Sequence, residues 1–441
     1  MEEMIDICSM ERSDVDKLYL CSTYFTIFYD RTKKYQVVFD TLSDSGGMKE
    51  VWCIVSNTAR ALKQRSLGMS IPRTKSSYFN NPQKIYSSKM FALLDKMVED
   101  GWFIYYRGGL YNMNPDMPLQ SVYMFTDKYL ALWKGVNVSD EKSTVQAVQV
   151  KDRETKEILS NKGRKGVALK ERSVLMLNEM LMNTQIFLDD IDVCVQQYTR
   201  IFNDNLQAGG RFYNTVGGVQ TLPQKRRKTM QINGENVVEL DFKAIHPALL
   251  YEKARQKAPD VVDYWIEHQW EGEFKPYPTF SPVFSPNDMS DEHTVRRLHK
   301  FAMLVGLNAK NIAGAVAGLS QEFFDDKKRA PEDRRYGEIS YGVGLRGKPT
   351  FPSKKICEHV MLWNKPISEF FFKDVGVILQ NVDSDIMALV IEELYGMGEV
   401  LLPMHDSIIV RESIADEAET IMRKAYKQLM DTDKFCFIER K

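Results

Sequence analysis

The stretch "VVELDFKAIHPALLYE", residues 237–252, joins an apolar strand pattern to a single acid. The apolar residues before Asp241 predict a buried strand, and Asp241 is the carboxylate that this strand carries at its tip. A second acid, Asp406, lies in the equally apolar "LLPMHDSIIV", residues 401–410. If the two strands are neighbours in a sheet, the carboxylates converge, and a divalent cation is then their natural counter-ion.

An aspartate at a strand end is more often a turn or capping residue than a metal ligand. The segments around these two aspartates must therefore show which interpretation holds. The stretch "TVRRLHKFAMLVGLNAKN", residues 294–311, predicts a helix. Four of its residues recur at four-residue steps and therefore share a face: Arg296, Lys300, Leu304 and Asn308. Such a face is suited to grip a triphosphate and a base, although a solvated basic face is the alternative interpretation.

The composition indicates a globular protein, with 44% hydrophobic and 27% charged residues in a chain of 441. This length predicts two to four domains. The formal net charge is −1, so any surface that binds nucleic acid must be local. The six cysteines are scattered without a CxxC pair, which favours a reducing compartment and disfavours a zinc site. With neither a signal peptide nor a run of 18 apolar residues, we expect a soluble, cytoplasmic protein with no membrane partner.

Residues 1–135 form the first predicted unit. We expect a strand over residues 34–42, then two helices and a hairpin that turns at Gly108-Gly109. This order of elements is typical of a winged-helix module. Such a module either binds duplex DNA or serves as a structural platform for protein contacts, and the sequence favours neither.

Three further segments complete the pattern. The stretch "GGRFYNTVGGVQTLP", residues 209–223, is a turn-rich segment that carries Arg211 and Gln220. The basic run Lys225, Arg226, Arg227 and Lys228 follows, as either a phosphate contact or a solvated approach to a hairpin. Asn233-Gly234 predicts the turn of that hairpin, which leads into the strand of Asp241.

Taken in order, these segments resemble the family A right-hand polymerases, typified by bacterial DNA polymerase I. The resemblance covers about residues 205–441. It is carried by Gly210-Arg211 with residues 219–223, by "DFKAIHPA" as motif A, by the helix of Lys300 as motif B, by His405-Asp406-Ser407 as motif C, and by the helix of Gln380 before motif C.

The resemblance implies an α+β right-hand fold behind an N-terminal winged-helix-like domain. The expected regions are the N-terminal domain 1–135, a linker 136–166, a helical thumb-like region 167–206, a first palm part with motif A 207–250, fingers with motif B 251–354, and a second palm part with motif C 355–441.

The resemblance also implies a role for each matched residue. Asp241 and Asp406 would hold two Mg²⁺ ions, for which Mn²⁺ can substitute, with help from the Phe242 backbone carbonyl. Lys300 would contact the triphosphate and donate a proton to pyrophosphate. The other nucleotide-binding residues would be Arg296, Leu304, Asn308 and His246. The primer–template contacts would come from Arg211, Gln220, His405, Gln380, Lys225, Arg226, Arg227 and Lys228.

Departures from the family pattern leave the choice of sugar open. His246 stands where DNA-synthesising members carry Glu, Leu304 and Asn308 replace an aromatic residue and a Tyr, and Ser407 replaces an acid. We expect a DNA-directed DNA polymerase without a proofreading exonuclease that uses primed DNA, nucleoside triphosphates and a replication or transcription partner protein. A single-subunit RNA polymerase on the same fold is the alternative. An inactive DNA-binding replication or defence protein is the third hypothesis.

Overall fold

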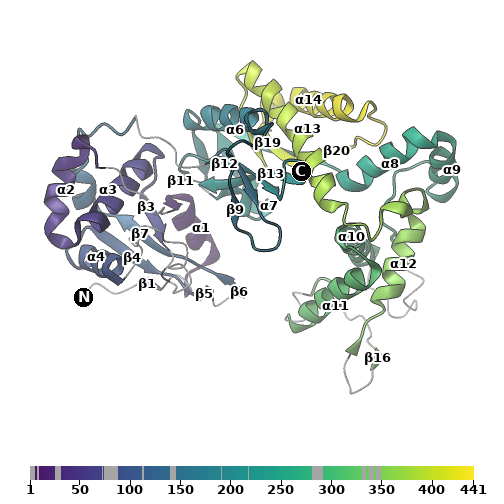
Figure 1. The fold of residues 1–441 in the computed structure, drawn as a ribbon, viewed down its shortest axis with the longest axis horizontal. Coiled ribbons are helices and arrows are strands. Elements are labelled where there is room, and N and C mark those ends of the chain that lie inside the picture. Colours follow the sequence, from purple (N-terminus) through teal and green to yellow (C-terminus); the bar gives the residue numbers. More distant parts are fainter. Residues whose placement is uncertain are drawn as a thin grey trace.

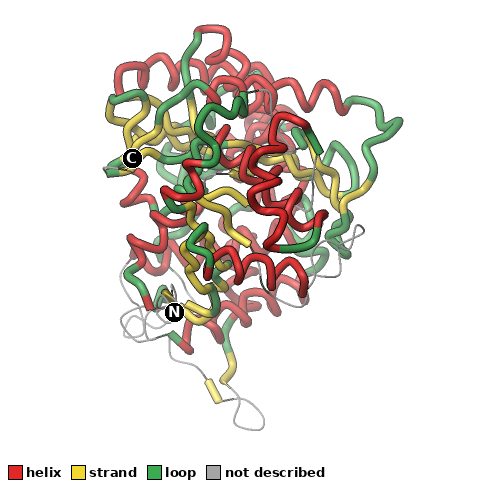
Figure 2. The backbone as a smooth tube through the Cα atoms, turned by 90° about the vertical axis from the view of Figure 1, so that its left-hand side faces the viewer, coloured by secondary structure: helices red, strands yellow, loops and turns green. Residues whose placement is uncertain are grey.

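Three sheets of four or more strands organise the described part of the chain, whose structure is a computed structural model (Figure 1). The structure describes residues 5–6, 9–24, 31–71, 73, 88–111, 114–139, 146–189, 191–216, 218–280, 292–329, 334–336, 342–343 and 349–441. Helices and strands alternate along the chain, so the architecture is mixed α/β. Figure 2 shows strands among helices in the middle of the molecule, with helices and loops at the top of the view.

The N-terminal sheet has the order β1-β4-β7-β3-β2 and its own hydrophobic core. Its strands are β1 (Ile5–Asp6), β2 (Ser22–Tyr24), β3 (Gly68–Ile71), β4 (Phe103–Arg107) and β7 (Ser121–Phe125). The hairpin expected to turn at Gly108-Gly109 is wrong, because β4 pairs with β7, whereas β5 (Leu110–Tyr111) pairs with β6 (Asn114–Pro118). The accompanying helices are α1 (Arg12–Leu20), α2 (Gln36–Leu42), α3 (Met48–Lys63), α4 (Ser88–Glu99) and α5 (Asp127–Ala131). The winged-helix assignment and the boundary at residue 135 stay predictions.

The strand expected over residues 34–42 is wrong, because this segment forms helix α2. Val38 and Leu42, one helical turn apart, are buried, whereas Val37 is 74% exposed. The β-branched valines favour a strand by propensity, but packing of this face against α3 overrides that preference.

Part of the expected linker belongs to the outer sheet, which has the order β13-β12-β8-β9. Strands β8 (Val148–Lys151) and β9 (Ile158–Leu159) fall within residues 136–166 and pair with β12 (Gln197–Asn203) and β13 (Gly209–Val216). Val148 and Val150 alternate inward and share a small core with Phe202 and Leu206, which explains why β8 forms within this polar segment.

The expected helical region 167–206 is helical only in its first part. Helix α6 (Val167–Met182) is followed by β10 (Ile186–Leu188), β11 (Ile191–Asp192) and β12. The helical face of α6 buries Val174, Leu177 and Leu181. Beyond it, strand pairing replaces helical packing.

The central sheet has the order β11-β10-β14-β15-β19-β18, and β20 also pairs with β15. The sheet joins strands that are far apart in the chain. Two come from residues 230–242, β14 (Met230–Ile232) and β15 (Glu235–Phe242), and three come from residues 401–440, β18 (Leu401–Pro403), β19 (Ser407–Arg411) and β20 (Ile438–Arg440). The hairpin predicted at Asn233-Gly234 is confirmed, since Ile232 pairs with Glu235 across a two-residue turn. Both turn residues have positive φ, 52° and 82°, as a type I′ turn requires.

Helices flank the central sheet and extend beyond it (Figure 1). The helices after α7 (Gln224–Arg227) are α8 (Ile245–Lys257), α9 (Pro259–Gln269), α10 (Glu292–Asn308), α11 (Ile312–Lys328), α12 (Ser353–Trp363), α13 (Gly376–Met397) and α14 (Ala415–Met430). A short ladder joins β16 (Gly342–Val343) to β17 (Pro349–Thr350). We call α10, α11 and α12, which pack on one another, the helical arm. Within the described ranges, no helix is both long and apolar enough to cross a bilayer.

Candidate active site

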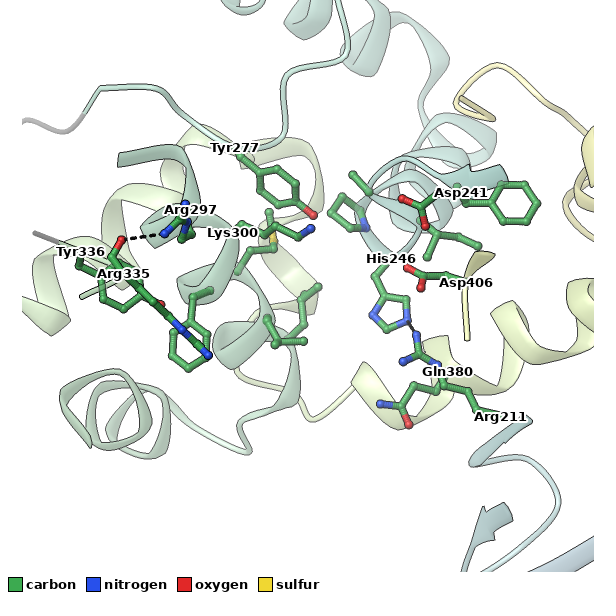
Figure 3. A pocket seen from close by; sticks show the side chains of 18 residues that line it. Arg211, Asp241, His246, Tyr277, Arg297, Lys300, Arg335, Tyr336, Gln380 and Asp406 are labelled. Carbon is green, nitrogen blue, oxygen red and sulfur yellow. Dashed lines mark hydrogen bonds between the residues drawn. The ribbon is translucent and has the colours of Figure 1, made fainter. Parts of the chain in front are cut away.

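The central sheet brings Asp241 and Asp406 together. Asp241 lies at the end of β15 and pairs in register with Ser407, the first residue of β19. The Phe242 amide donates a hydrogen bond of 3.1 Å to the Asp406 carbonyl. Both acids line a cleft of about 500 Å³, and Figure 3 shows their carboxylates on the same wall of it. The strand pairing expected from the sequence is therefore present.

Backbone turns with left-handed conformation hold both acids. Ala244, at the passage from β15 into α8, has a φ of 50°, and His405, in the turn between β18 and β19, has a φ of 75°. Such conformations cost energy in residues other than glycine and persist only where the surroundings enforce them. This strain is located in the two segments that present Asp241 and Asp406.

The surroundings of Asp241 disfavour the ionised form of its carboxylate. Burial raises its pKa to about 6, and the nearby charge of Asp406 acts in the same direction, although an ion pair with Lys441 opposes both. Lys441 follows β20, which pairs with β15, and its ammonium group lies against the Asp241 carboxylate. The acid pair thus attracts a cation.

The donor set fits a Mg²⁺ site that the protein only partly surrounds. Among the residues described, no group of three or more His, Cys, Asp or Glu side chains is arranged to hold a metal ion. Mg²⁺ prefers oxygen ligands and commonly takes one or two protein carboxylates, with water and substrate phosphates completing its shell. Asp241 and Asp406 supply two carboxylates, and the Lys441 ammonium stands where positive charge is favoured.

The opposite wall of the cleft is cationic and aromatic. Helix α10 contributes Arg297, Lys300 and Leu304, and the segment after α9 contributes Tyr277 (Figure 3). The Lys300 ammonium and the Tyr277 hydroxyl point across the cleft towards the acids. The buried Tyr277 has a raised pKa because of desolvation, and the charge of Asp406 contributes to the increase. An anionic ligand therefore fits between the two walls.

The predicted row on α10 is only partly in the cleft. Lys300 and Leu304 line it, but the Arg296 guanidinium lies over the Tyr277 ring at 5.4 Å, and the Asn308 amide donates back to the Leu304 carbonyl at 2.7 Å. With 3.6 residues per turn, each four-residue step rotates by about 40°, so a row of four drifts off one face. Arg297 takes the place in the cleft that we expected for Arg296.

Arg211 and His246 meet at a buried acid that the sequence did not single out. Asp383 on α13 accepts hydrogen bonds from Arg211 Nη2 at 2.5 Å and contacts His246 Nε2 at 2.9 Å. The chain reaches Arg211 through Gly210, whose φ is 93° and where a Cβ would lie 2.4 Å from the Phe202 ring. Both Arg211 and His246 line the cleft.

The other predicted primer–template residues lie in different settings. Gln380 on α13 lines the cleft. The Gln220 amide nitrogen donates to the Phe212 and Pro403 carbonyls, at 2.9 and 2.8 Å, so this side chain ties β13 to β18. The His405 ring packs edge-on against Tyr213 at 5.3 Å, and burial lowers its pKa.

The basic run after Pro223 splits into two kinds of side chain. Lys225 and Lys228 are exposed. Arg226 pairs with Asp16 at 3.4 Å and with Asp189 at 3.2 Å. The remaining arginine, at position 227, forms a 2.8 Å ion pair with Glu239. The two arginines therefore serve intramolecular contacts in this structure.

A third acid, Glu239 on β15, contacts Ser407, the residue that follows Asp406. It lies two residues before Asp241 on β15, and its Oε1 accepts a hydrogen bond of 2.8 Å from the Ser407 hydroxyl. Its charge contributes to the raised pKa of Asp241. Residues two apart on a strand point to the same face of the sheet. The spacing of Glu239 and Asp241 was therefore the feature of the sequence that could have identified Glu239.

Comparisons with known proteins give little further guidance. No family model matches the chain, and no curated protein matches it. Among solved structures it is similar to the "POL domain of Pol1 from M. smegmatis complex with DNA primer-template and dNTP", with 14% identity and a TM-score of 0.29. The match covers 59% of this chain and 49% of that one, so the chain spans about half the length of the solved structure. A structural similarity this low does not identify the function. The function is therefore inferred from the geometry of the cleft.

Proposed function

We propose that the protein is a template-directed nucleotidyltransferase of the family A polymerase type, with DNA synthesis as its activity. One observation carries this proposal: two strand-end carboxylates face a lysine and a tyrosine across a cleft of about 500 Å³. A nucleoside triphosphate with its cations has the matching charge pattern, because its phosphates bridge the metal wall and the cationic wall.

The residues divide the chemistry between them. Asp241 and Asp406 would hold Mg²⁺, which would activate the primer 3′-hydroxyl and neutralise charge on the leaving pyrophosphate. Lys300, which lines the cleft, would contact the triphosphate and donate a proton to the pyrophosphate. Tyr277, against whose ring the Arg296 guanidinium packs, lines the cleft and would border the bound nucleotide.

In this proposal, His246 determines whether the cleft accepts deoxyribonucleotides or ribonucleotides. Its ring lines the cleft beside the acid pair and is only 12% exposed, so it offers a rigid obstacle to a 2′-hydroxyl. This favours DNA synthesis. RNA synthesis on the same fold is the second candidate, and the absence of a proofreading exonuclease remains a prediction.

The test is nucleotide incorporation on a primed DNA template with Mg²⁺, supplying either dNTPs or rNTPs. We expect the parent protein to extend the primer with dNTPs. Asp241→Asn and Asp406→Asn keep the side-chain shapes but remove the charges, and each should lower the rate at least about a thousandfold.

Glu267→Gln is the matched control, since it neutralises an exposed acid on α9. It should retain the parent rate. Primer extension with rNTPs alone would support the RNA polymerase hypothesis. If the parent protein incorporated neither substrate, the hypothesis of an inactive DNA-binding protein would remain. Parental activity in the two Asn variants would contradict the assignment of the site.

A further inference from the structure

Asp383 is a fully buried acid directly behind the cleft. It lies in the second turn of α13, its side chain is 0% exposed, and it is paired with Arg211 at 2.5 Å and with His246 at 2.9 Å. Arg211 Nε also contacts both Asp383 oxygens, at 3.1 and 3.3 Å. One carboxylate therefore holds two side chains that line the cleft.

The contact with Asp383 fixes the proton on the His246 ring. An ionised carboxylate can only accept, so Nε2 must carry a hydrogen and donate it to Asp383. Arg211 Nη2 lies 3.3 Å from the same nitrogen, and because both atoms are then donors they share the Asp383 acceptor and do not bond to each other. The other ring nitrogen lies on the side away from Arg211 (Figure 3). The ring is thus held in one orientation at its cleft-facing position.

This arrangement differs from the support of the other acid nearby on α13. Asp385, two residues further on, pairs with Arg200 at 2.8 Å and with Lys170 at 2.6 Å. Neither of these partners lines the cleft. Asp385 therefore fastens α13 to the outer sheet and α6, whereas Asp383 fastens α13 to residues of the site.

The geometry points to Asp383 as a positioning residue that sets the sugar selectivity of the cleft by locking His246 against Arg211. This inference rests on the proposed nucleotidyl transfer. A side chain discriminates against one hydroxyl only if it cannot move aside when that hydroxyl arrives. The buried, charge-assisted contact supplies this rigidity, because swinging His246 away would leave the Asp383 carboxylate with less compensation in a dry environment.

The experiment measures kcat/KM for a dNTP and for the matching rNTP on the same primed template. Asp383→Asn removes the charge at nearly constant volume, and we expect the dNTP/rNTP ratio to move at least about tenfold towards one. His246→Ala should shift the ratio in the same direction. Asp385→Asn, the matched control on the same helix, should leave the ratio at its parental value even if it lowers the melting temperature.

A double variant separates positioning from general weakening. If Asp383 acts through His246, adding Asp383→Asn to His246→Ala changes the ratio no further. If Asp383→Asn fails to fold, His246→Gln replaces it, because a glutamine amide can still donate to Asp383 and should keep more selectivity than His246→Ala.

Three outcomes would overturn the inference. These are a parental ratio in folded Asp383→Asn, equal ratios in His246→Gln and His246→Ala, and additive effects in the double variant. With any of these outcomes, the proposed function would still stand if the parent protein extended the primer and Asp241→Asn did not. A parent that incorporates neither substrate would overturn the function, and this inference with it.

Discussion

Lys441 occupies the position from which a metal cation would approach Asp241. Its backbone amide donates to the Glu239 carbonyl at 2.9 Å, which fixes the residue beside β15. The preceding Arg440 is anchored on α14 by Asp416 at 2.6 Å and Glu419 at 2.9 Å. If Asp241 holds the metal ion that we propose, the Lys441 ammonium must leave before the ion binds, and only molecules in which it has left would be competent.

Lys441→Met should accordingly lower the Mg²⁺ concentration needed for half-maximal primer extension, by about threefold or more. The measurement is a Mg²⁺ titration of the extension rate at saturating nucleotide. Lys427→Met, an exposed position on α14, is the control and should titrate like the parent. An unchanged or higher requirement in Lys441→Met would show that the lysine does not compete with the metal.

Individual site residues were predictable where the local pattern was unusual. Asp241 and Asp406 each interrupt or end an apolar strand, and this was visible in the sequence. Asp383 was not, because its partners Arg211 and His246 are 172 and 137 residues away in the chain. An acid in an apolar helix shows that a partner must exist, but only the packing of α13 against β13 and α8 identifies it.

At the scale of elements, α10 joins the cleft to the interior of the helical arm. His299, next to Lys300, is fully buried and donates from Nδ1 to the Pro278 carbonyl at 3.1 Å. Its ring lies 5.2 Å from that of His359 on α12. Burial lowers the pKa of His299 to about 4, and the proximity of His359 adds to this shift.

The arm should therefore lose stability in mild acid. Between pH 6.5 and about 4 the unfolded chain takes up a proton at His299 that the folded chain refuses, so stability falls as the pH falls. From pH 7 to pH 5 this single group removes about 2 kcal/mol. His299→Gln should abolish that part of the loss, as measured by urea unfolding at both pH values.

His268→Gln is the control for this measurement, because His268 is exposed on α9. It should show the same pH dependence as the parent. If His299→Gln also followed the parent, the acid sensitivity would have to come from other groups.

Elements were predictable where periodicity and packing agree. The amphipathic helix α3 and the Asn233-Gly234 hairpin follow their sequence patterns directly. Helix α2 does not, because its adjacent valines indicate a strand, whereas burial of Val38 and Leu42 against α3 selects a helix. The face of α10 was misjudged for a geometric reason, since a four-residue row winds around the helix.

At the scale of the whole molecule, both backbone and side-chain groups dock the N-terminal unit on the rest of the chain. The Val195 amide donates to the Gln64 carbonyl at 2.8 Å, and the Arg65 guanidinium donates to the Thr184 carbonyl at 2.6 Å. A separate core was predictable from composition and spacing. The docking was not, because groups that lie so far apart in the chain leave no local pattern in the sequence.

If the protein binds DNA, as we propose, a local basic surface should make the phosphate contacts, since the formal net charge of the chain is −1. Lys225 and Lys228 are the exposed members of their basic run. Replacing both by Ala should weaken binding of primed DNA. The slope of log affinity against log salt should become shallower by about 0.9 for each phosphate that the protein no longer neutralises. Fluorescence anisotropy across a salt series measures this slope.

Lys424→Ala combined with Lys427→Ala on α14 removes the same charge elsewhere and should keep the parental slope. If both double variants changed the slope equally, the effect would be one of net charge. The Lys225 and Lys228 surface would then have no specific role.

The most direct measurement of the central claim is anomalous scattering from Mn²⁺ in crystals of the protein with primed DNA and a non-hydrolysable nucleoside triphosphate. We predict two peaks about 3.5–4 Å apart between the carboxylates of Asp241 and Asp406, with triphosphate oxygens extending towards Lys300. Peaks elsewhere, or none at these carboxylates while the nucleotide is bound, would contradict metal-dependent nucleotidyl transfer at this site.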